Sequence, residues 1–395
     1  MRKRIPFLLF TCLALFAFLL LAGVGAPYVK HSLLVSIDGE RLDGREVFTD
    51  SLHHLKAQAA GGYLPLYEKL RKKYDAKETL NYIGRGLGDY LTAACDRKRE
   101  DPLDATLEWS KKKSAPFIYY KERAGRNVDL DRLGRAVARA LDKGGTAEAF
   151  SETVSPQVTL SDLCDRTALI GSFSTSFAKS GEHRRHNIAL AARAIDGCAL
   201  LSGETFSFNA VVGERTEERG FETANIIVNG DFVKGVGGGV CQVSTTLYNA
   251  VLLAGLTPTH AAAHSRPVSY VGYARDCTVS SAIDFTFVNE TPYPLYIAAD
   301  ISGNTLTFRL YGERKSGKYE LKSEVLQRLP FRALDETGAP LDDLKDRTLL
   351  RAGREGVRSA LYRLHTLNGV TTTTIVRESY YPPQDAVYSE RKEAA

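Results

Sequence analysis

Apolar residues recur at helical spacing in a segment that begins directly after a run of three glycines. Val240, Val243 and Leu247 lie three or four positions apart, and Gly255 follows the last apolar residues of the pattern. This spacing predicts a helix that ends at Gly255. Cys241 falls in its first turn, where unpaired backbone N–H groups and the positive end of the helix dipole favour a thiolate. The pattern therefore predicts a reactive cysteine.

Apolar stripes and alternating runs elsewhere predict a mixture of helices and strands. One helical stripe runs from Leu80 to Leu91, and a second runs from Asp129, as its N-cap, to Gly144. Alternating or β-branched runs predict strands at 33–37, 105–109, 116–120, 283–288, 295–298 and 305–310, and a hairpin of 357–364 and 370–376 around an Asn-Gly turn. These elements predict an α+β fold.

The N-terminal residues have the pattern of a membrane anchor. Arg2, Lys3 and Arg4 precede a charge-free apolar run at 5–26, about the 20 residues that span a bilayer as a helix. Positive residues before such a span hold the N-terminus in the cytoplasm. We therefore expect a single-pass cell-membrane protein whose bulk is extracytoplasmic, with a cleaved signal peptide as the alternative.

Charge and cysteine content limit the partners and the chemistry of the chain. The net charge of +5 is spread over short basic clusters with acidic residues between them, so we expect no nucleic-acid partner. Five cysteines follow the apolar run, so at least one is unpaired within the chain. His260 and His264 are four positions apart, but Pro258 argues against a helix there and no Cys-x-x-Cys pair is present. We expect no metal and no cofactor.

A series of motifs between Thr167 and Gly312 resembles the VanW family. The motifs are GSFST at 171–175, RHNI at 185–188, GETFSFN at 203–209, GGGVCQVSTTLYNA at 237–250, HS at 264–265, YV at 270–271 and DCTV at 276–279. The chain departs from the usual family pattern at Ser202, Gly272, Ala274 and Cys277. The resemblance implies association with the bacterial cell envelope and, through some relatives, with glycopeptide resistance. It does not supply a reaction.

The segment ahead of these motifs resembles the peptidoglycan-binding domain that often precedes VanW domains. The resemblance lies in PLDA at 102–105, at the start of a predicted strand, and in GRNVD at 125–129, which leads into a helix. We therefore divide the chain into a transmembrane anchor (1–27), a membrane-proximal stalk (28–78), a mixed α/β envelope-binding domain (79–165), a VanW domain with a central helix on antiparallel strands (166–314) and a small β-rich tail with a disordered end (315–395).

Cys241, His264 and Asp276 form a candidate catalytic set. Thiol catalysis needs a nucleophile, a base within hydrogen-bond reach and a group that orients the base. The order of Cys, then His, then Asp276 or Asp284 is that of papain-like and transglutaminase-like enzymes. A buried structural cysteine under a glycine turn is the alternative interpretation.

The same region supplies candidate substrate-binding residues. Gln242 could donate a hydrogen bond to an oxyanion, or satisfy local backbone groups instead. The glycines could let a substrate chain or another backbone approach Cys241, and tyrosines could line a groove or belong to the core. The candidates are Gly237, Gly238, Gly239, Gln242, Tyr248 and Tyr270. The basic run 183–186 is interpreted as a solvated loop, with an arginine pairing with a substrate carboxylate as the alternative.

Two hypotheses of function follow. The first is a membrane-anchored envelope protein that binds peptidoglycan or cell-wall precursor peptides, with the link to glycopeptide (vancomycin) resistance that the family resemblance implies. The second is a thiol-dependent peptidase, amidase or transpeptidase that acts on cell-wall peptides through Cys241 and His264. A titratable thiol with a lowered pKa favours the enzyme, whereas an inert Cys241 favours binding.

Overall fold

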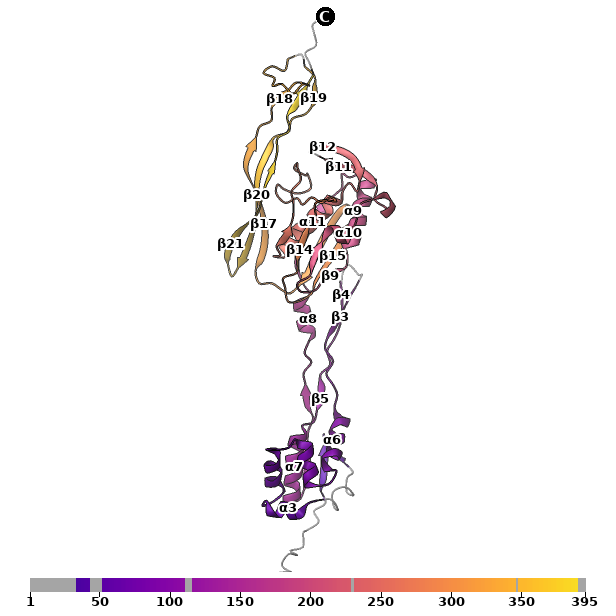
Figure 1. Cartoon of the computed structure of the whole chain (residues 1–395), viewed down its shortest axis with the longest axis vertical. Coiled ribbons are helices and arrows are strands. Elements are labelled where there is room, and N and C mark those ends of the chain that lie inside the picture. Colours follow the sequence, from indigo (N-terminus) through magenta and orange to yellow (C-terminus); the bar gives the residue numbers. More distant parts are fainter. Residues whose placement is uncertain (1–32, 43–51, 111–115, 229–230, 346, 390–395) are drawn as a thin grey trace, which may run out of the picture. The chain divides into compact units, whose positions relative to one another are not determined.

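The computed structural model describes residues 33–42, 52–110, 116–228, 231–345 and 347–389 (Figure 1). They form two compact units. The first contains the residues up to Ala105 together with Glu122–Gln157, and the second contains Thr106–Lys121 and Val158–Ala395. Both units mix helices with strands, which confirms the α+β class.

The predicted membrane anchor at 1–27 lies outside the described residues and stays a prediction. Within the described ranges, every helix is too short or too polar to cross a bilayer.

The first unit packs helices around a short three-stranded sheet of order β2-β1-β6, in which β1 and β6 are parallel. Asp129 caps α7 as predicted, because its side chain accepts hydrogen bonds from the backbone N–H groups of Asp131 and Arg132. Its elements are β1 (Leu34–Ile37), β2 (Glu40–Leu42), α3 (His54–Ala59), α4 (Tyr63–Arg71), α5 (Ala76–Ile83), α6 (Leu87–Lys98), β5 (Gly125–Asn127), α7 (Leu130–Lys143), β6 (Thr146–Ala149) and β7 (Glu152–Val154).

Two sequence predictions need correction in this unit. The stripe from Leu80 to Leu91 is two helices, α5 and α6, because Gly86 adopts a left-handed conformation between them. The boundary predicted at residue 78 lies inside one hydrophobic core, since Val35 and Tyr67 pack in the same cluster as Leu133. A separate stalk is therefore not formed by the described residues of 28–78.

The second unit is built around helix α11 (Val240–Leu253), which packs on an antiparallel sheet of order β8-β16-β15-β9 (Figure 1). Gly171 of β8 permits this packing, because a Cβ there would lie 2.5 Å from the Ala250 carbonyl oxygen. The other elements before the C-terminal strands are β3 (Thr106–Trp109), β4 (Phe117–Tyr120), α8 (Leu160–Arg166), β8 (Ala168–Ser176), α9 (Glu182–Ile195), β9 (Cys198–Leu200), β10 (Thr205–Ser207), α10 (Phe208–Val212), the 3-10 helix Glu217–Arg219, β11 (Thr223–Val228), β12 (Asp231–Val236), β13 (Pro258–His260), β14 (Thr286–Val288), β15 (Leu295–Ser302) and β16 (Thr305–Gly312).

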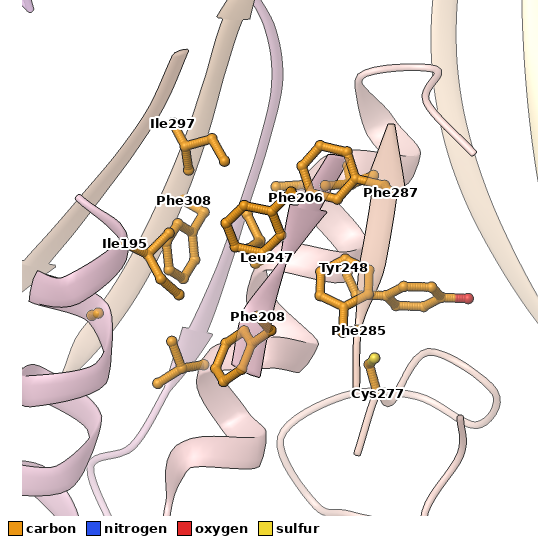
Figure 2. Close-up of a cluster of buried hydrophobic side chains, with 14 of the residues drawn as sticks. Ile195, Phe206, Phe208, Leu247, Tyr248, Cys277, Phe285, Phe287, Ile297 and Phe308 are labelled. Carbon is orange, nitrogen blue, oxygen red and sulfur yellow. The ribbon is translucent and has the colours of Figure 1, made fainter. Parts of the chain in front are cut away.

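Aromatic side chains from α11 and the second sheet, β10-β14-β13, fill the core beside this helix (Figure 2). Phe206 and Phe287 stack with ring centroids 5.0 Å apart, and Tyr248 meets Phe285 edge to face at 5.8 Å. Leu247 is fully buried among them. Each such side chain contributes about 1.5–3 kcal/mol by its removal from water, so this core fixes the position of α11.

Three of the C-terminal strands, β17, β20 and β21, pack onto the same core, whereas β18, β22 and β19 form a small sheet of their own. Leu361 of β20 is buried in the α11 cluster, and the Arg363 guanidinium donates to the Leu256 carbonyl at 2.8 Å. The boundary predicted at residue 315 is therefore not a break in packing, although the hairpin predicted around Asn368 is confirmed. The strands are β17 (Lys318–Leu329), β18 (Ala333–Leu334), β19 (Leu349–Arg351), β20 (Gly356–Leu367), β21 (Val370–Tyr381) and β22 (Ala386–Tyr388).

Replacing Leu247 with alanine tests the role of this core. The side chain is 0% exposed, so Leu247→Ala should lower the free energy of unfolding of the second unit by about 2–5 kcal/mol through lost burial and a cavity. Urea unfolding followed by circular dichroism measures the change. Leu201→Ala is the control, because Leu201 is 59% exposed, and its effect should stay within about 0.5 kcal/mol. Equal effects of the two substitutions would contradict the packing described.

Candidate functional site

The turn ahead of α11 is shaped by three glycines. Gly237 and Gly239 have positive φ angles of 83° and 111°, which disfavour other residues. Gly238 lets another backbone approach, because a Cβ there would lie 2.7 Å from the Asn225 carbonyl oxygen. The buried amide of Asn187 on α9 donates to the Gly238 carbonyl at 3.0 Å. The space around this turn is thus occupied by the protein's own chain, and the glycines set the entry of the helix.

The polar side chains of α11 hold the segment that carries Asp276. Ser244 donates to the Cys277 carbonyl at 2.7 Å, and Thr245 accepts from the Cys277 N–H at 2.9 Å. One turn later, the Asn249 amide donates to the Arg275 carbonyl at 2.8 Å. The hydroxyls of Ser244 and Thr245 are therefore structural hydrogen-bonding groups.

Cys241, His264 and Asp276 come together at the N-terminus of α11. The Asp276 carboxylate accepts hydrogen bonds at 2.7 Å from both the backbone N–H and the Nδ1 of His264. Because Nδ1 is bound to the carboxylate, Nε2 is the ring nitrogen left for the Cys241 sulfur. The side chains of Cys241 and His264 are close enough to shift each other's pKa by hydrogen bonding. Asp284, the alternative, instead accepts from Ser207 and from the Asn209 backbone.

The electrostatics of the set favour an ion pair between thiolate and imidazolium. Burial is the largest influence on Cys241 and opposes the thiolate, but hydrogen bonding and charge from His264, with Val279 and Thr278, lower the thiol pKa. Burial likewise opposes the charged His264 ring, yet Asp276 and Cys241 raise its pKa to about 9. Asp276 is 1% exposed, and despite this burial its contacts with His264 and Tyr381 lower its pKa. Cys241 remains partly exposed.

The C-terminal hairpin supplies two further residues that hold Asp276. The Tyr381 hydroxyl donates to the second carboxylate oxygen, Oδ1, and accepts the Ala274 N–H at 2.9 Å. Arg377 donates to the Ala274 carbonyl at 2.8 Å and lies 3.6 Å from Asp276 Oδ1. Strand β21 therefore takes part in orienting the carboxylate, a role that the sequence did not suggest.

Two residues predicted to bind substrate belong to the core. Gln242 is 0% exposed, and its amide nitrogen donates to Thr175 Oγ1 and the Ser176 carbonyl, both at 3.0 Å. Because both amide hydrogens are used, Gln242 has none left for an oxyanion. Tyr248 is 1% exposed and packs among the aromatic rings, so it does not line a groove.

Tyr270 and a neighbouring cavity lie near the set. Tyr270 is half-buried, and the guanidinium carbon of Arg184 lies 6.0 Å from its ring centroid. A cavity of about 240 Å³ is lined by Val268, Tyr273, Asp276 and Tyr381, among others, but not by Cys241. It therefore lies on the Asp276 side of the set.

No group of three or more His, Cys, Asp or Glu side chains within the described ranges is arranged to hold a metal ion. The five described cysteines are free thiols in the structure.

Comparison with known proteins identifies the region that carries the site. The family model described as VanW like protein matches residues 183–311. The protein YoaR of Bacillus subtilis (strain 168), described as uncharacterized, is 47% identical over 146 residues, which cover 37% of this chain and 48% of YoaR. The vancomycin B-type resistance protein VanW of Enterococcus faecalis (strain ATCC 700802 / V583) is 29% identical over 127 residues, 30% of this chain and 46% of that protein. The matches thus span about half of each relative.

Among solved structures, the crystal structure of HP0197-G5 matches at 18% identity, covering 18% of this chain and 96% of that chain. The TM-score of this match is 0.12.

Thiol labelling tests the state of Cys241. At a pH of about 6.5, where an ordinary thiol with a pKa of about 8.5 is almost fully protonated, iodoacetamide should label Cys241 ahead of the other cysteines, because the pKa of Cys241 is lowered. Burial raises the pKa of Cys95 to about 11 and also raises that of Cys277. Peptide mass spectrometry locates the label, and His264→Ala should slow labelling at Cys241 alone. A thiol that reacts only after denaturation would show that Cys241 is a packing residue.

Replacing Tyr381 with phenylalanine tests the support of Asp276 by β21. Tyr381→Phe removes a hydroxyl contact to a buried carboxylate, so the free energy of unfolding should fall by about 1–3 kcal/mol. The pKa of Asp276 should rise, the pKa of His264 should fall, and labelling of Cys241 at a pH of about 6.5 should slow. Tyr380→Phe on the same strand is the control, because Tyr380 is 55% exposed. If both variants behave alike, β21 does not support the site.

Proposed function

We propose that this chain, whose residues 183–311 form a VanW-like domain, is a thiol-dependent acyl-transfer enzyme with Cys241 as nucleophile and His264 as base and acid. The observation that carries the proposal is the buried hydrogen bond between Asp276 and His264 Nδ1, together with the interaction of His264 with the Cys241 thiol that lowers the thiol pKa. A packing cysteine needs no oriented imidazole, whereas a nucleophile does.

The residues support two chemical steps. In the first, the Cys241 thiolate attacks the carbonyl carbon of an amide, a C–S bond forms, and the His264 imidazolium gives its proton to the leaving amine as the C–N bond breaks. In the second, water or an amine attacks the thioester, His264 takes the attacking group's proton, and the thiolate leaves. The N-terminal end of α11 stabilises the oxyanion, because its positive dipole end faces the developing charge.

We propose peptides of the bacterial cell wall as the substrate class. The printed name of the Enterococcus faecalis relative, a vancomycin resistance protein, supports an envelope substrate, and so does the resemblance of residues 79–165 to peptidoglycan-binding domains. An extracytoplasmic location behind an anchor at 1–27 fits this substrate and rests on the apolar run in the sequence. The outcome of the second step distinguishes a peptidase or amidase, which uses water, from a transpeptidase, which uses an amine.

Intact-protein mass spectrometry tests the proposal. Incubation with muropeptides of the natural wall should give a covalent adduct at Cys241 with the mass of an acyl group. Cys241→Ser should abolish this thioester with little effect on the fold, because the substitution changes little volume. As a control for binding, Cys241→Ser should still co-sediment with purified sacculi. If no wall peptide forms an adduct while wild type and Cys241→Ser bind sacculi equally, the protein binds and does not catalyse.

The reaction rate should depend on pH in a bell shape. The active form pairs the thiolate with the imidazolium, so activity should rise as Cys241 loses its proton below the ordinary thiol pKa and fall as His264 loses its proton near pH 9. The two limits belong to the pair because the groups interact. Initial rates of thioester formation between about pH 5 and 10 measure the profile. A rate that keeps rising up to about pH 10 would exclude His264 as the acid.

A further inference from the structure

Two arginines lie against the glycine turn that leads into Cys241. A Cβ on Gly239 would lie 2.9 Å from Arg184 Cγ, and a Cβ on Gly237 would lie 2.8 Å from Arg215 Cβ. Arg184 comes from α9, and Arg215 follows α10. The side chains therefore approach the turn from two elements that are distant in sequence.

The described partners of both guanidinium groups are neutral. Arg184 donates to Gln242 Oε1 at 2.8 Å and to the Ser180 hydroxyl, and Arg215 donates to Asn209 Oδ1 at 2.6 Å. Neither arginine is within ion-pair distance of a carboxylate among the described side chains, in contrast to Arg377 and its neighbour Asp276. A guanidinium has five N–H donors, so each arginine keeps donors for a further acceptor.

The two positive charges act at the nucleophile. Burial lowers the pKa of Arg184 and of Arg215, whereas the negative charge of Cys241 raises both. Arginine stays charged under such shifts. The charge of Asp284 also raises the pKa of Arg215, but no described carboxylate lies within ion-pair distance of either guanidinium. Two partly buried cations without a close carboxylate are unfavourable until an anion binds.

We propose that Arg184 and Arg215 bind a carboxylate of the substrate next to the amide that Cys241 attacks. A planar guanidinium binds a carboxylate through two parallel hydrogen bonds. Because both groups are charged, these bonds are stronger than hydrogen bonds between neutral groups. This assignment rests on the proposed function and defines its substrate further: the acyl donor is an anionic peptide. The carboxylate is either the C-terminal group of the donor or that of an acidic side chain.

The experiment compares three donor peptides of the same sequence on the wild-type full chain. One has free carboxylates, one has only its C-terminal carboxylate converted to an amide, and one has only its side-chain carboxylate converted. We expect kcat/KM for thioester formation to fall about 10- to 100-fold for the peptide that loses the recognised carboxylate, as expected for a lost charged hydrogen bond. The affected peptide identifies which carboxylate is bound.

Arginine variants then connect this preference to the two residues. Arg184→Gln and Arg215→Gln should each reduce the preference for the recognised carboxylate, mainly through KM. Arg185→Gln is the control, because Arg185 is exposed and donates to the Ala178 and Ser180 carbonyls. The preference of the Arg185→Gln variant for the recognised carboxylate should match that of the wild type.

Three results separate the possible failures. Equal turnover of all three peptides by the wild type overturns the carboxylate site and leaves the acyl-transfer function in place. An equal fall in kcat for all peptides in the arginine variants also overturns it, since the arginines would then support the oxyanion or the thiolate. Absence of a thioester with every peptide contradicts the proposed function itself. The wild-type comparison decides the question even where a variant does not fold.

Discussion

The buried carboxylate of Asp276 is the contact on which the candidate site depends. One carboxylate oxygen accepts hydrogen bonds from the backbone N–H and the ring of His264, and the other accepts one from the Tyr381 hydroxyl. A carboxylate that is 1% exposed would cost several kcal/mol without such partners. The loop of His264, the segment held by α11 and strand β21 therefore form one interdependent arrangement, and loss of any of them leaves a buried charge unsatisfied.

Much of the helix and part of the site could be predicted from the sequence. The apolar spacing from Val240 to Leu247 fixed the start of α11, and with it the place of Cys241 in the first turn. The order of Cys241, His264 and Asp276 along the chain gave a set whose last two members are joined by a hydrogen bond in the structure. These features depend on local spacing, which a single sequence displays.

Contacts between distant residues could not be predicted in the same way. The first-turn position of Gln242 suggests an oxyanion or nearby backbone groups as its partners, but its partners in the structure, Thr175 and Ser176, lie 67 and 66 residues away. Tyr381 lies 105 residues beyond Asp276, and no spacing rule links the two. The packing across the predicted boundaries at 78 and 315 is set by tertiary contacts of residues such as Tyr67 and Leu361, which local sequence patterns do not show.

The most direct test of the ion pair is a pH titration of the Cys241 thiolate in the wild-type protein. Thiolate absorbance near 240 nm is recorded across the pH range and corrected with the same measurement on Cys241→Ser, so that the other cysteines cancel. Asp276, His264 and the N-terminus of α11 should place the midpoint below the ordinary thiol value of about 8.5. A midpoint at or above that value would contradict the thiolate–imidazolium pair and leave Cys241 as a packed thiol.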